Sequence, residues 1–185
     1  MATPRRLQTE RLLLRCWTPA DAELLRDSLD RSDAHLRPYI PFMRHEPRTL
    51  DETTARLQQI IENFDAGLHF QYAVFDAAES RLLGEVMLIR RDPAAGLELG
   101  YWLDVSAQRC GYATEAASAL VQLAFHELGV AKLELRCEPE NVASGRLAAR
   151  LEFVLLRTIV GGSTDMRGDP CDLQVWSLDR PRDDC

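Results

Sequence analysis

The chain lacks the patterns that mark several large protein classes. It holds a single lysine, Lys132, and contains neither Gly-x-x-x-x-Gly-Lys-Ser/Thr nor Gly-x-Gly-x-x-Gly, which argues against a nucleotide P-loop and a dinucleotide fingerprint. Its five cysteines have no paired spacing and its four histidines are scattered, so we expect neither a metal site nor a disulfide framework. No apolar run approaches a membrane span, and residues 1–15 lack the apolar core of a signal peptide, which predicts a cytoplasmic protein without membrane contact.

The charge balance narrows the possible partners. A formal net charge of −7 makes nucleic acid a poor partner, because such binding needs a basic face that neutralises phosphates. An acidic surface suits a cationic acceptor such as an amine, or it serves solubility alone. With 185 residues, 46% hydrophobic and 28% charged, the chain is expected to fold as one globular domain over residues 1–185.

One segment carries a specific chemical signal. Residues 108–114 read Gln-Arg-Cys-Gly-Tyr-Ala-Thr, after a strand-like run and before an apolar-periodic helix. Gly111 lets the main chain approach a ligand closely. The unpaired N–H groups at the helix start point toward an anion, and the helix dipole adds attraction. The segment therefore predicts a site for a phosphorylated cofactor, with an ordinary helix N-terminus as the alternative.

Periodicity predicts a mixture of strands and helices. Thr18 and Thr49 are expected to cap two helices, the second through a capping box with Glu52. A longer helix links two strands, and this connection requires a crossover and a parallel pair within a mixed sheet. Helices are expected after Thr18, after Thr49, at 113–128 and at 143–150; strands at 10–15, 69–76, 82–90, 96–105, 132–137, 153–160 and 172–178; a turn at Asp92-Pro93; and a loop at 161–171.

Residues 108–114 resemble the Gln/Arg-x-x-Gly-x-Gly/Ala signature of the GNAT superfamily of acyl-CoA N-acyltransferases. Gln108, Gly111 and Ala113 occupy the signature positions, while Arg109 stands where many members carry glycine. The order of predicted elements is similar to the GNAT fold over about residues 8–180. The resemblance implies an α/β (α+β) fold with a mixed central sheet of about seven strands flanked by about four helices. It also implies that the fourth and fifth strands splay apart and hold acetyl-CoA between them, with coenzyme A as the product.

A second GNAT pattern, Asn-x-x-Ala-x-x-x-Tyr-x-x-x-Gly-Phe, matches from Asn141 in spacing but not in every residue. Ser144 takes the alanine position, Ala148 the tyrosine position and Glu152 the glycine position, which we expect to alter the turn into the sixth strand. The pattern resembles the Rim-type (RimJ/RimL-like) branch, whose members acetylate N-terminal amines of ribosomal proteins and carry Asn-x-x-Ser without tyrosine. Further Rim-type resemblance lies at residues 9–15, 36–42 and 98–103.

The resemblance assigns cofactor contacts to three stretches. Main-chain groups at the end of the fourth strand are expected to pair with the pantetheine arm, and one N–H there to stabilise the developing oxyanion. Arg109 adds charge at the pyrophosphate, or is a solvated arginine. Asn141 bonds the cofactor arm, caps a helix, or does both. The expected cofactor residues are Leu103, Asp104, Val105, Gln108, Arg109, Cys110, Gly111, Tyr112, Ala113, Thr114, Asn141 and Ser144.

Acetyl transfer also needs a base, because an amine at neutral pH is mostly protonated. The resemblance points first to Glu98 and second to Asp165, the alternatives being a solvent-facing strand carboxylate and a turn-forming aspartate. Ser144 is the expected acid for the thiolate, or bonds to backbone in the first helical turn. The expected acceptor wall, which alternatively packs on the core, consists of Tyr39, Phe42 and Met43.

These features together predict an acetyl-CoA-dependent N-acetyltransferase that acts by direct transfer in a ternary complex. Its acceptor is either a protein N-terminal amine, which the Rim-type resemblance favours, or a small cationic amine such as an aminoglycoside antibiotic. The acidic balance and Asp165, Asp169 and Asp172 suit an aminoglycoside as acceptor. Acetylation of such an antibiotic would confer resistance to it. The alternative is a non-catalytic acyl-CoA-binding sensor on the same fold. The resemblance also makes a homodimer plausible.

Overall fold

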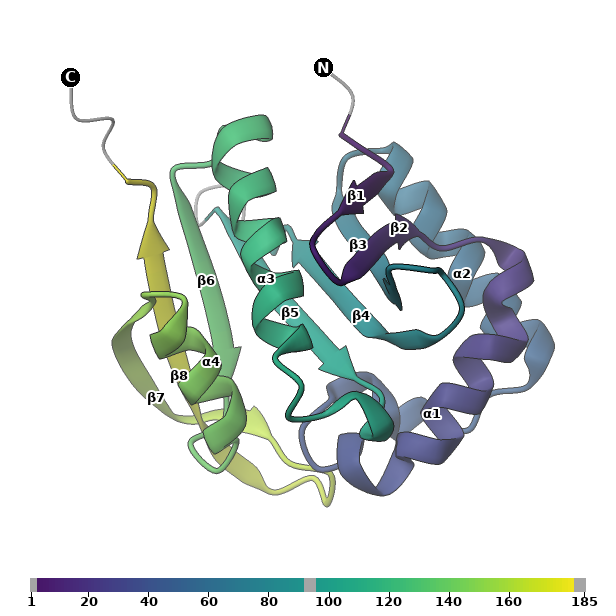
Figure 1. Ribbon diagram of the computed structural model, residues 1–185. Helices are drawn as coiled ribbons and strands as arrows, with labels where there is room; N and C mark the ends of the chain where they lie inside the picture. The colour runs from purple at the N-terminus through teal and green to yellow at the C-terminus, as the bar shows by residue number, and fades with distance from the viewer. Residues whose placement is uncertain (1–2, 92–95, 182–185) are drawn as a thin grey trace.

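The computed structural model describes residues 3–91 and 96–181, in which a mixed sheet lies between two layers of helices (Figure 1). The strand order is β1-β2-β3-β4-β5-β6-β8-β7, and every neighbouring pair is antiparallel except β5 and β6. The strands are β1 Arg6–Gln8, β2 Leu12–Cys16, β3 His69–Asp76, β4 Leu82–Ile89, β5 Leu97–Leu103, β6 Lys132–Cys137, β7 Val154–Thr164 and β8 Pro170–Asp179. The helices are α1 Ala22–Leu36, α2 Leu50–Asp65, α3 Tyr112–Gln122 and α4 Val142–Arg150, with short helical turns η1 Pro19–Asp21, η2 Pro41–His45, η3 Val105–Ala107 and η4 Leu123–Glu127.

The predicted mixed α/β architecture is confirmed, with one strand more than the seven expected. The additional strand, β1, pairs with β2 and is too short and polar to show a pattern. The loop predicted at 161–171 is wrong, because β7 and β8 pair as far as Thr164 and Pro170 and leave a turn at 165–169. The turn predicted at Asp92-Pro93 lies outside the described residues.

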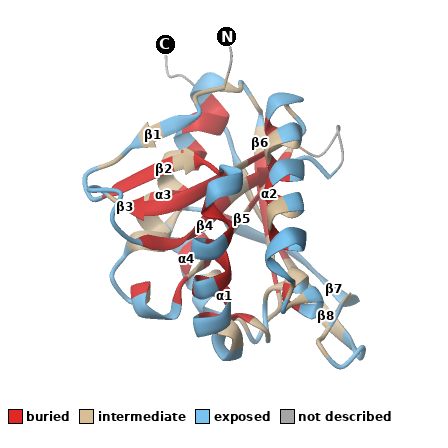
Figure 2. Cartoon of the chain, turned by 90° about the vertical axis from the view of Figure 1, so that its right-hand side faces the viewer, coloured by how far each residue is buried: buried red, intermediate tan, exposed pale blue. Residues whose placement is uncertain are grey.

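Both faces of the sheet are covered, as β2 illustrates. Leu12, Leu13 and Leu14 are all fully buried, although consecutive strand residues point to opposite faces. Leu12 and Leu14 belong to the cluster that includes the buried face of α3, whereas Leu13 belongs to the cluster with α1 and α2. In Figure 2 the central strands are accordingly red, while β7 at the end of the sheet is mostly pale blue. Apolar residues on successive positions of β2 therefore reflect a strand in the middle layer.

Strands β5 and β6 pair with each other at one end only and separate toward the other end. Leu97 lies opposite Leu133 and Glu98 opposite Glu134, and the pairing stops there. In Figure 1 the two strands separate toward the lower edge, and α3 packs in front of them. Gly96 permits the close approach at the joined end, since a Cβ there would stand 2.3 Å from the carbonyl oxygen of Lys132. This is the splay that the resemblance implies.

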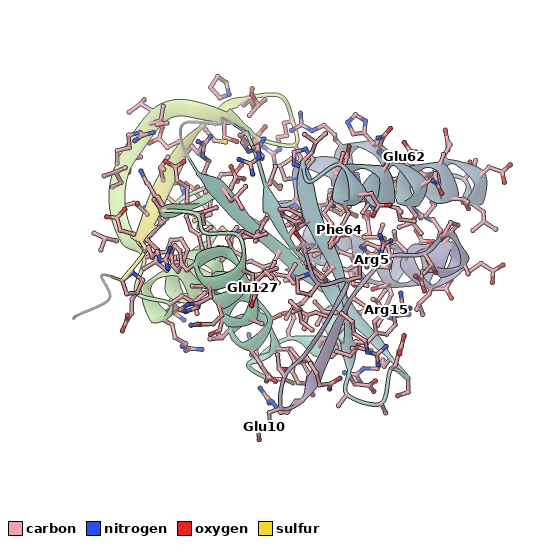
Figure 3. The ribbon with its side chains drawn as sticks, turned by 90° about the horizontal axis from the view of Figure 1, so that it is seen from above. Arg5, Glu10, Arg15, Glu62, Phe64 and Glu127 are labelled. Atoms are coloured by element: carbon pink, nitrogen blue, oxygen red, sulfur yellow. The ribbon has the colours of Figure 1, made fainter. Side chains whose placement is uncertain are left out.

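The N-terminal segment is fixed against α2 and the sheet. The Arg5 guanidinium lies 5.6 Å from the ring centroid of Phe64, and Figure 3 shows the two side chains together. The Tyr72 hydroxyl donates a hydrogen bond of 2.6 Å to the carbonyl of Pro4. These contacts hold the residues before β1 against α2 and β3. Across residues 3–91 and 96–181, none of the helices has the length and apolarity that a bilayer crossing requires.

Candidate active site

The segment at 108–114 forms a tight turn that opens α3. Gly111 precedes the first helical residue and has a φ of 81°, in the left-handed region that glycine adopts without strain. Arg109 has a φ of 58°, a conformation that costs a non-glycine residue about 1–2 kcal/mol. Arg109 thus has a backbone conformation that favours glycine, the residue that many members of the resembling family carry at this position.

A carboxylate in the first turn of α3 ties this turn to the β1–β2 connection. Glu115 Oε1 accepts hydrogen bonds from Thr9 Oγ1 at 2.6 Å and from the Arg11 main-chain N–H at 2.9 Å. Its Oε2 accepts from Arg11 Nε at 2.7 Å, and Arg11 Nη1 donates to the carbonyl of Cys110 at 3.0 Å. Burial raises the pKa of Glu115, but these donors outweigh burial and the net pKa is lowered. The carboxylate is therefore ionised and holds the turn in place.

A first cavity of about 470 Å³ lies beside the turn. The start of α3 contributes Gly111, Ala113 and Thr114 to its lining. Three arginines line it from two elements, Arg109 from the turn and Arg146 and Arg150 from α4. Further lining residues include Leu103, Gln108, Asn141 and Ser144. A helix N-terminus combined with three arginines forms an electropositive site that suits phosphate groups.

A second cavity of about 480 Å³ adjoins the first. Aromatic side chains of Tyr39, Phe42 and Trp102 form part of its wall. Ionisable side chains come from β5, from β6 and from the residues that follow β4 and β6, namely Arg91, Glu98, Arg136, Cys137 and Glu138. The second cavity therefore combines an aromatic surface with charges of both signs, unlike the basic first cavity.

The two cavities share part of their walls, and a pair of hydroxyl groups lies at this junction. The shared residues are Tyr39, Ile40, Tyr101, Trp102, Asn141 and Ser144. The Tyr101 hydroxyl lies 3.0 Å from Ser144 Oγ, and burial raises the pKa of Tyr101 despite this hydrogen bond. Asn141 caps α4 by accepting from the Ser144 N–H at 3.2 Å, which fixes the serine at the helix start. The junction thus presents two protonated hydroxyls to both cavities.

Glu98, predicted as the base, lines the second cavity but is held by arginine. Arg91 donates from Nε to Oε2 at 2.5 Å and from Nη2 to Oε1 at 3.0 Å. Arg136 Nε lies 3.4 Å from the same Oε2. Two guanidinium groups therefore balance the charge of Glu98, which makes this carboxylate a weak site for a further cation.

A buried carboxylate behind the aromatic wall fixes the position of Trp102. Glu85 is 1% exposed and accepts from Trp17 Nε1 at 2.6 Å and from Trp102 Nε1 at 3.3 Å. Arg56 Nη2 lies 4.0 Å from Glu85, and its guanidinium stands 4.5 Å from the Phe42 ring centroid. Phe42 in turn meets Trp102 edge to face at 6.5 Å between centroids. The wall of the second cavity is therefore held by a hydrogen-bonded polar group beneath it.

Several predicted cofactor residues face elsewhere. The main-chain N–H of Asp104 donates to the carbonyl of Leu83 at 2.9 Å, and that of Val105 donates to Ser32 Oγ at 2.9 Å, so neither N–H is free for a ligand. Neither residue lines the first or the second cavity, whereas Leu103 of the same stretch lines the first. The side chain of Asp104 is instead buried against α1, where it accepts from Ser28 and Arg31 at 2.7 Å each.

Cys110 and Tyr112 also lie outside both cavities. Cys110 is an exposed free thiol, 3.3 Å from the carbonyl of Gln108. The Tyr112 ring packs under the Arg11 guanidinium at 4.9 Å. Both side chains support the turn from its outer side, although their main chain belongs to it.

Two predicted catalytic and acceptor residues have structural positions instead. Asp165 Oδ1 accepts from the main-chain N–H groups of Asp169 at 2.9 Å and Arg167 at 2.8 Å, and these bonds lower its pKa. It closes the β7–β8 turn and lines neither cavity, so the prediction of a base at Asp165 is wrong. Met43 is fully buried among residues of α1 and α2, so its predicted place in the acceptor wall is also wrong.

The second sequence pattern keeps its shape where its residues differ. Glu152 has a φ of 65°, the left-handed conformation expected of glycine, so the predicted change of the turn into the following strand is wrong. Ala148, in the tyrosine position, is fully buried and offers no hydroxyl. The hydroxyl near Ser144 comes instead from Tyr101 of β5, which sequence reasoning missed. In the sequence, Tyr101 was marked only by its place in the Glu98–Leu103 segment, and this segment does not specify where the Tyr101 ring points.

Comparison with known proteins agrees with this geometry. A family model described as "Acetyltransferase (GNAT) domain" matches residues 11–154. The ribosomal protein uS5-alanine N-acetyltransferase of Escherichia coli is 28% identical over 150 residues, which cover 80% of this chain and 77% of that protein. The Bacillus subtilis protein named "Probable N-acetyltransferase YjcK" is 29% identical over 107 residues, which are 57% of this chain and span 59% of the length of YjcK.

Among solved structures, a similar fold occurs in RimL, the ribosomal L7/L12 alpha-N-protein acetyltransferase in complex with coenzyme A. Its TM-score is 0.85 at 21% identity, and the superposition covers 96% of this chain and 97% of that one. At this identity the likeness establishes a shared fold over nearly the whole chain.

Proposed function

We propose that this chain, which belongs to the acetyltransferase (GNAT) domain family, transfers an acetyl group from acetyl-CoA to a primary amine within a ternary complex. The match over residues 11–154 confirms the family predicted from the turn at 108–114 and from the segment after Asn141. The observation that carries the proposal is the meeting of a basic cavity and an aromatic, charged cavity at the hydroxyl pair of Tyr101 and Ser144. The donor can reach this pair from the first cavity and the acceptor from the second.

The first cavity is the site for acetyl-CoA, which supplies the acetyl group as a thioester. The N–H groups at the start of α3 and the guanidinium groups of Arg109, Arg146 and Arg150 would hold its phosphates. Leu103 and Asn141 line the path from there to the junction. The cavity is also lined by the remaining predicted cofactor residues, which would contact acetyl-CoA as well: Gln108, Gly111, Ala113, Thr114 and Ser144.

Ser144 would donate a proton to the sulfur of the leaving group. It lines both cavities, and its hydroxyl is paired with that of Tyr101. Because burial raises the pKa of Tyr101, that hydroxyl remains protonated at neutral pH and can support a proton on Ser144. The pair takes the place of the helical tyrosine that Ala148 replaces.

The second cavity would receive the acceptor, and a peptide N-terminus fits best. The similar Escherichia coli enzyme is named for acetylation of an alanine of ribosomal protein uS5. Tyr39, Phe42 and Trp102 offer flat surfaces to an extended chain. The aspartates that favoured an aminoglycoside, namely Asp165, Asp169 and Asp172, line neither cavity.

The test is release of free thiol from acetyl-CoA in the presence of a panel of amines. Peptides that begin with Ala or Ser should be acetylated, and mass spectrometry should place the added acetyl group on the N-terminal amine. Turnover of aminoglycosides but not of peptides would show that the acceptor is an aminoglycoside and contradict the assignment of a peptide N-terminus. Tight binding of acetyl-CoA without turnover of any acceptor would support a non-catalytic sensor and contradict the proposal.

A further inference from the structure

The second cavity holds two carboxylates that differ in their surroundings. Glu98 is paired with Arg91 and Arg136. Glu138, at the end of β6, has no arginine, lysine or histidine within ion-pair distance among residues 3–91 and 96–181. We infer that Glu138, rather than Glu98, binds the ammonium group of the acceptor and takes its proton, an inference that rests on the proposed function.

Glu138 is held in place by neutral donors from the β7–β8 hairpin. Its Oε1 accepts from Ser163 Oγ at 3.3 Å and from Cys171 Sγ at 3.4 Å. Burial raises the pKa of Cys171, so that side chain stays a neutral thiol and donates. No hydrogen bond to Oε2 comes from the described residues, and this oxygen is available to a ligand of the cavity.

The backbone connects Glu138 to the hydroxyl junction. Its carbonyl accepts from the main-chain N–H of Asn141 at 3.0 Å, and Asn141 in turn caps the helix that carries Ser144. Glu138, Asn141 and Ser144 all line the second cavity. An ammonium bound to Glu138 therefore balances the charge of this carboxylate, at the place where the second cavity meets the site for the thioester.

The protons balance in this arrangement. An acceptor ammonium gives one proton to Glu138, which passes it to water, and the neutral amine then forms the C–N bond as the C–S bond breaks. The second proton leaves the nitrogen at this stage. Ser144 gives its own proton to the sulfur and regains that second one. The products are the acetylated amine, coenzyme A and one released proton.

The experiment compares E138Q with E98Q and with the matched control E140Q, since Glu140 is exposed and lines neither cavity. Steady-state rates are measured with acetyl-CoA and an Ala-initiated peptide, and acetyl-CoA binding is measured by calorimetry. We expect E138Q to lower kcat/KM about a hundredfold, through both a higher peptide KM and a lower kcat, because a general base contributes at least this much. Acetyl-CoA affinity should stay within twofold of wild type, and E140Q should behave as wild type.

The inference is overturned if E138Q keeps wild-type kcat/KM, or if E98Q loses more activity than E138Q. If E138Q does not fold, E138D decides the matter. Its carboxylate is withdrawn by one methylene, so an unchanged peptide KM would contradict direct contact. A wild-type protein that binds acetyl-CoA but acetylates none of the amines would instead remove the proposed function and this inference with it.

Discussion

The first and second cavities are built in different ways, although they share a wall. The first includes a turn and a helix start at residues 108–114, which are contiguous in sequence and offer main-chain N–H groups, beside side chains from α1, β5 and α4. The second is formed by side chains from η2, β4, β5, β6 and the β7–β8 hairpin. A site made of local backbone leaves a motif in the sequence, whereas a site made of converging side chains leaves none.

The substitution with the largest expected effect tests whether the backbone of the turn at Gly111 is needed for acetyl-CoA binding in the first cavity. Gly111→Val places a β-branched residue at a φ of 81° and should weaken acetyl-CoA binding about a hundredfold, or ~3 kcal/mol, because the N–H groups at the helix start are displaced. Calorimetry measures the dissociation constant.

The matched control for this change is Gly129→Val. Gly129 also has a positive φ, 64°, and a Cβ at this position would meet no other atom within 4 Å. It lies at the other end of the helical segment, so the substitution should lose similar stability and keep acetyl-CoA affinity. Equal weakening of binding by both substitutions would show that the turn has no special role.

The next effect tests the junction that joins the cavities. Ser144→Ala should lower kcat about a hundredfold, and Tyr101→Phe about tenfold, with little change in acetyl-CoA affinity. Because the two hydroxyls are 3.0 Å apart, the double variant should be no slower than Ser144→Ala alone. Additive losses in rate measurements would mean that Tyr101 acts independently of Ser144.

The smallest effect concerns the support of β5 by α1, on which both cavities depend. Burial raises the pKa of Asp104, but hydrogen bonds from Arg31, Ser106 and Ser28 outweigh it and lower the pKa to about 2. Asp104→Asn should reduce the free energy of unfolding by about 1–2 kcal/mol at neutral pH. Because the folded-state pKa lies below the ordinary value of 3.8, the wild type has this stabilisation above pH 4 and loses it as the pH falls toward 2.

Urea unfolding at several pH values measures this difference, which should close near pH 2. The control is Asp165→Asn, at a surface turn, which should change the unfolding free energy much less. A difference between wild type and Asp104→Asn that persists unchanged at pH 2 would contradict the assignment of this stability to the ionised carboxylate.

The sequence by itself determined the features that depend on neighbouring residues. The N-cap at Thr18, the capping box at Thr49, the apolar run of β2 and the turn before α3 follow from local hydrogen bonding and periodicity, and the structure has all of them. Even Arg109 and Glu152 keep the glycine-like backbone of their patterns, because the surrounding turn outweighs a strain of about 1–2 kcal/mol.

Only the tertiary structure decided what the side chains meet. It placed Tyr101 against Ser144, occupied Glu98 with arginine and left Glu138 without a cationic partner among the described residues. It also assigned Asp165 to a turn and Met43 to the core. Such outcomes depend on pairings between strands and helices that lie far apart in the chain, and residue type and spacing do not specify these pairings.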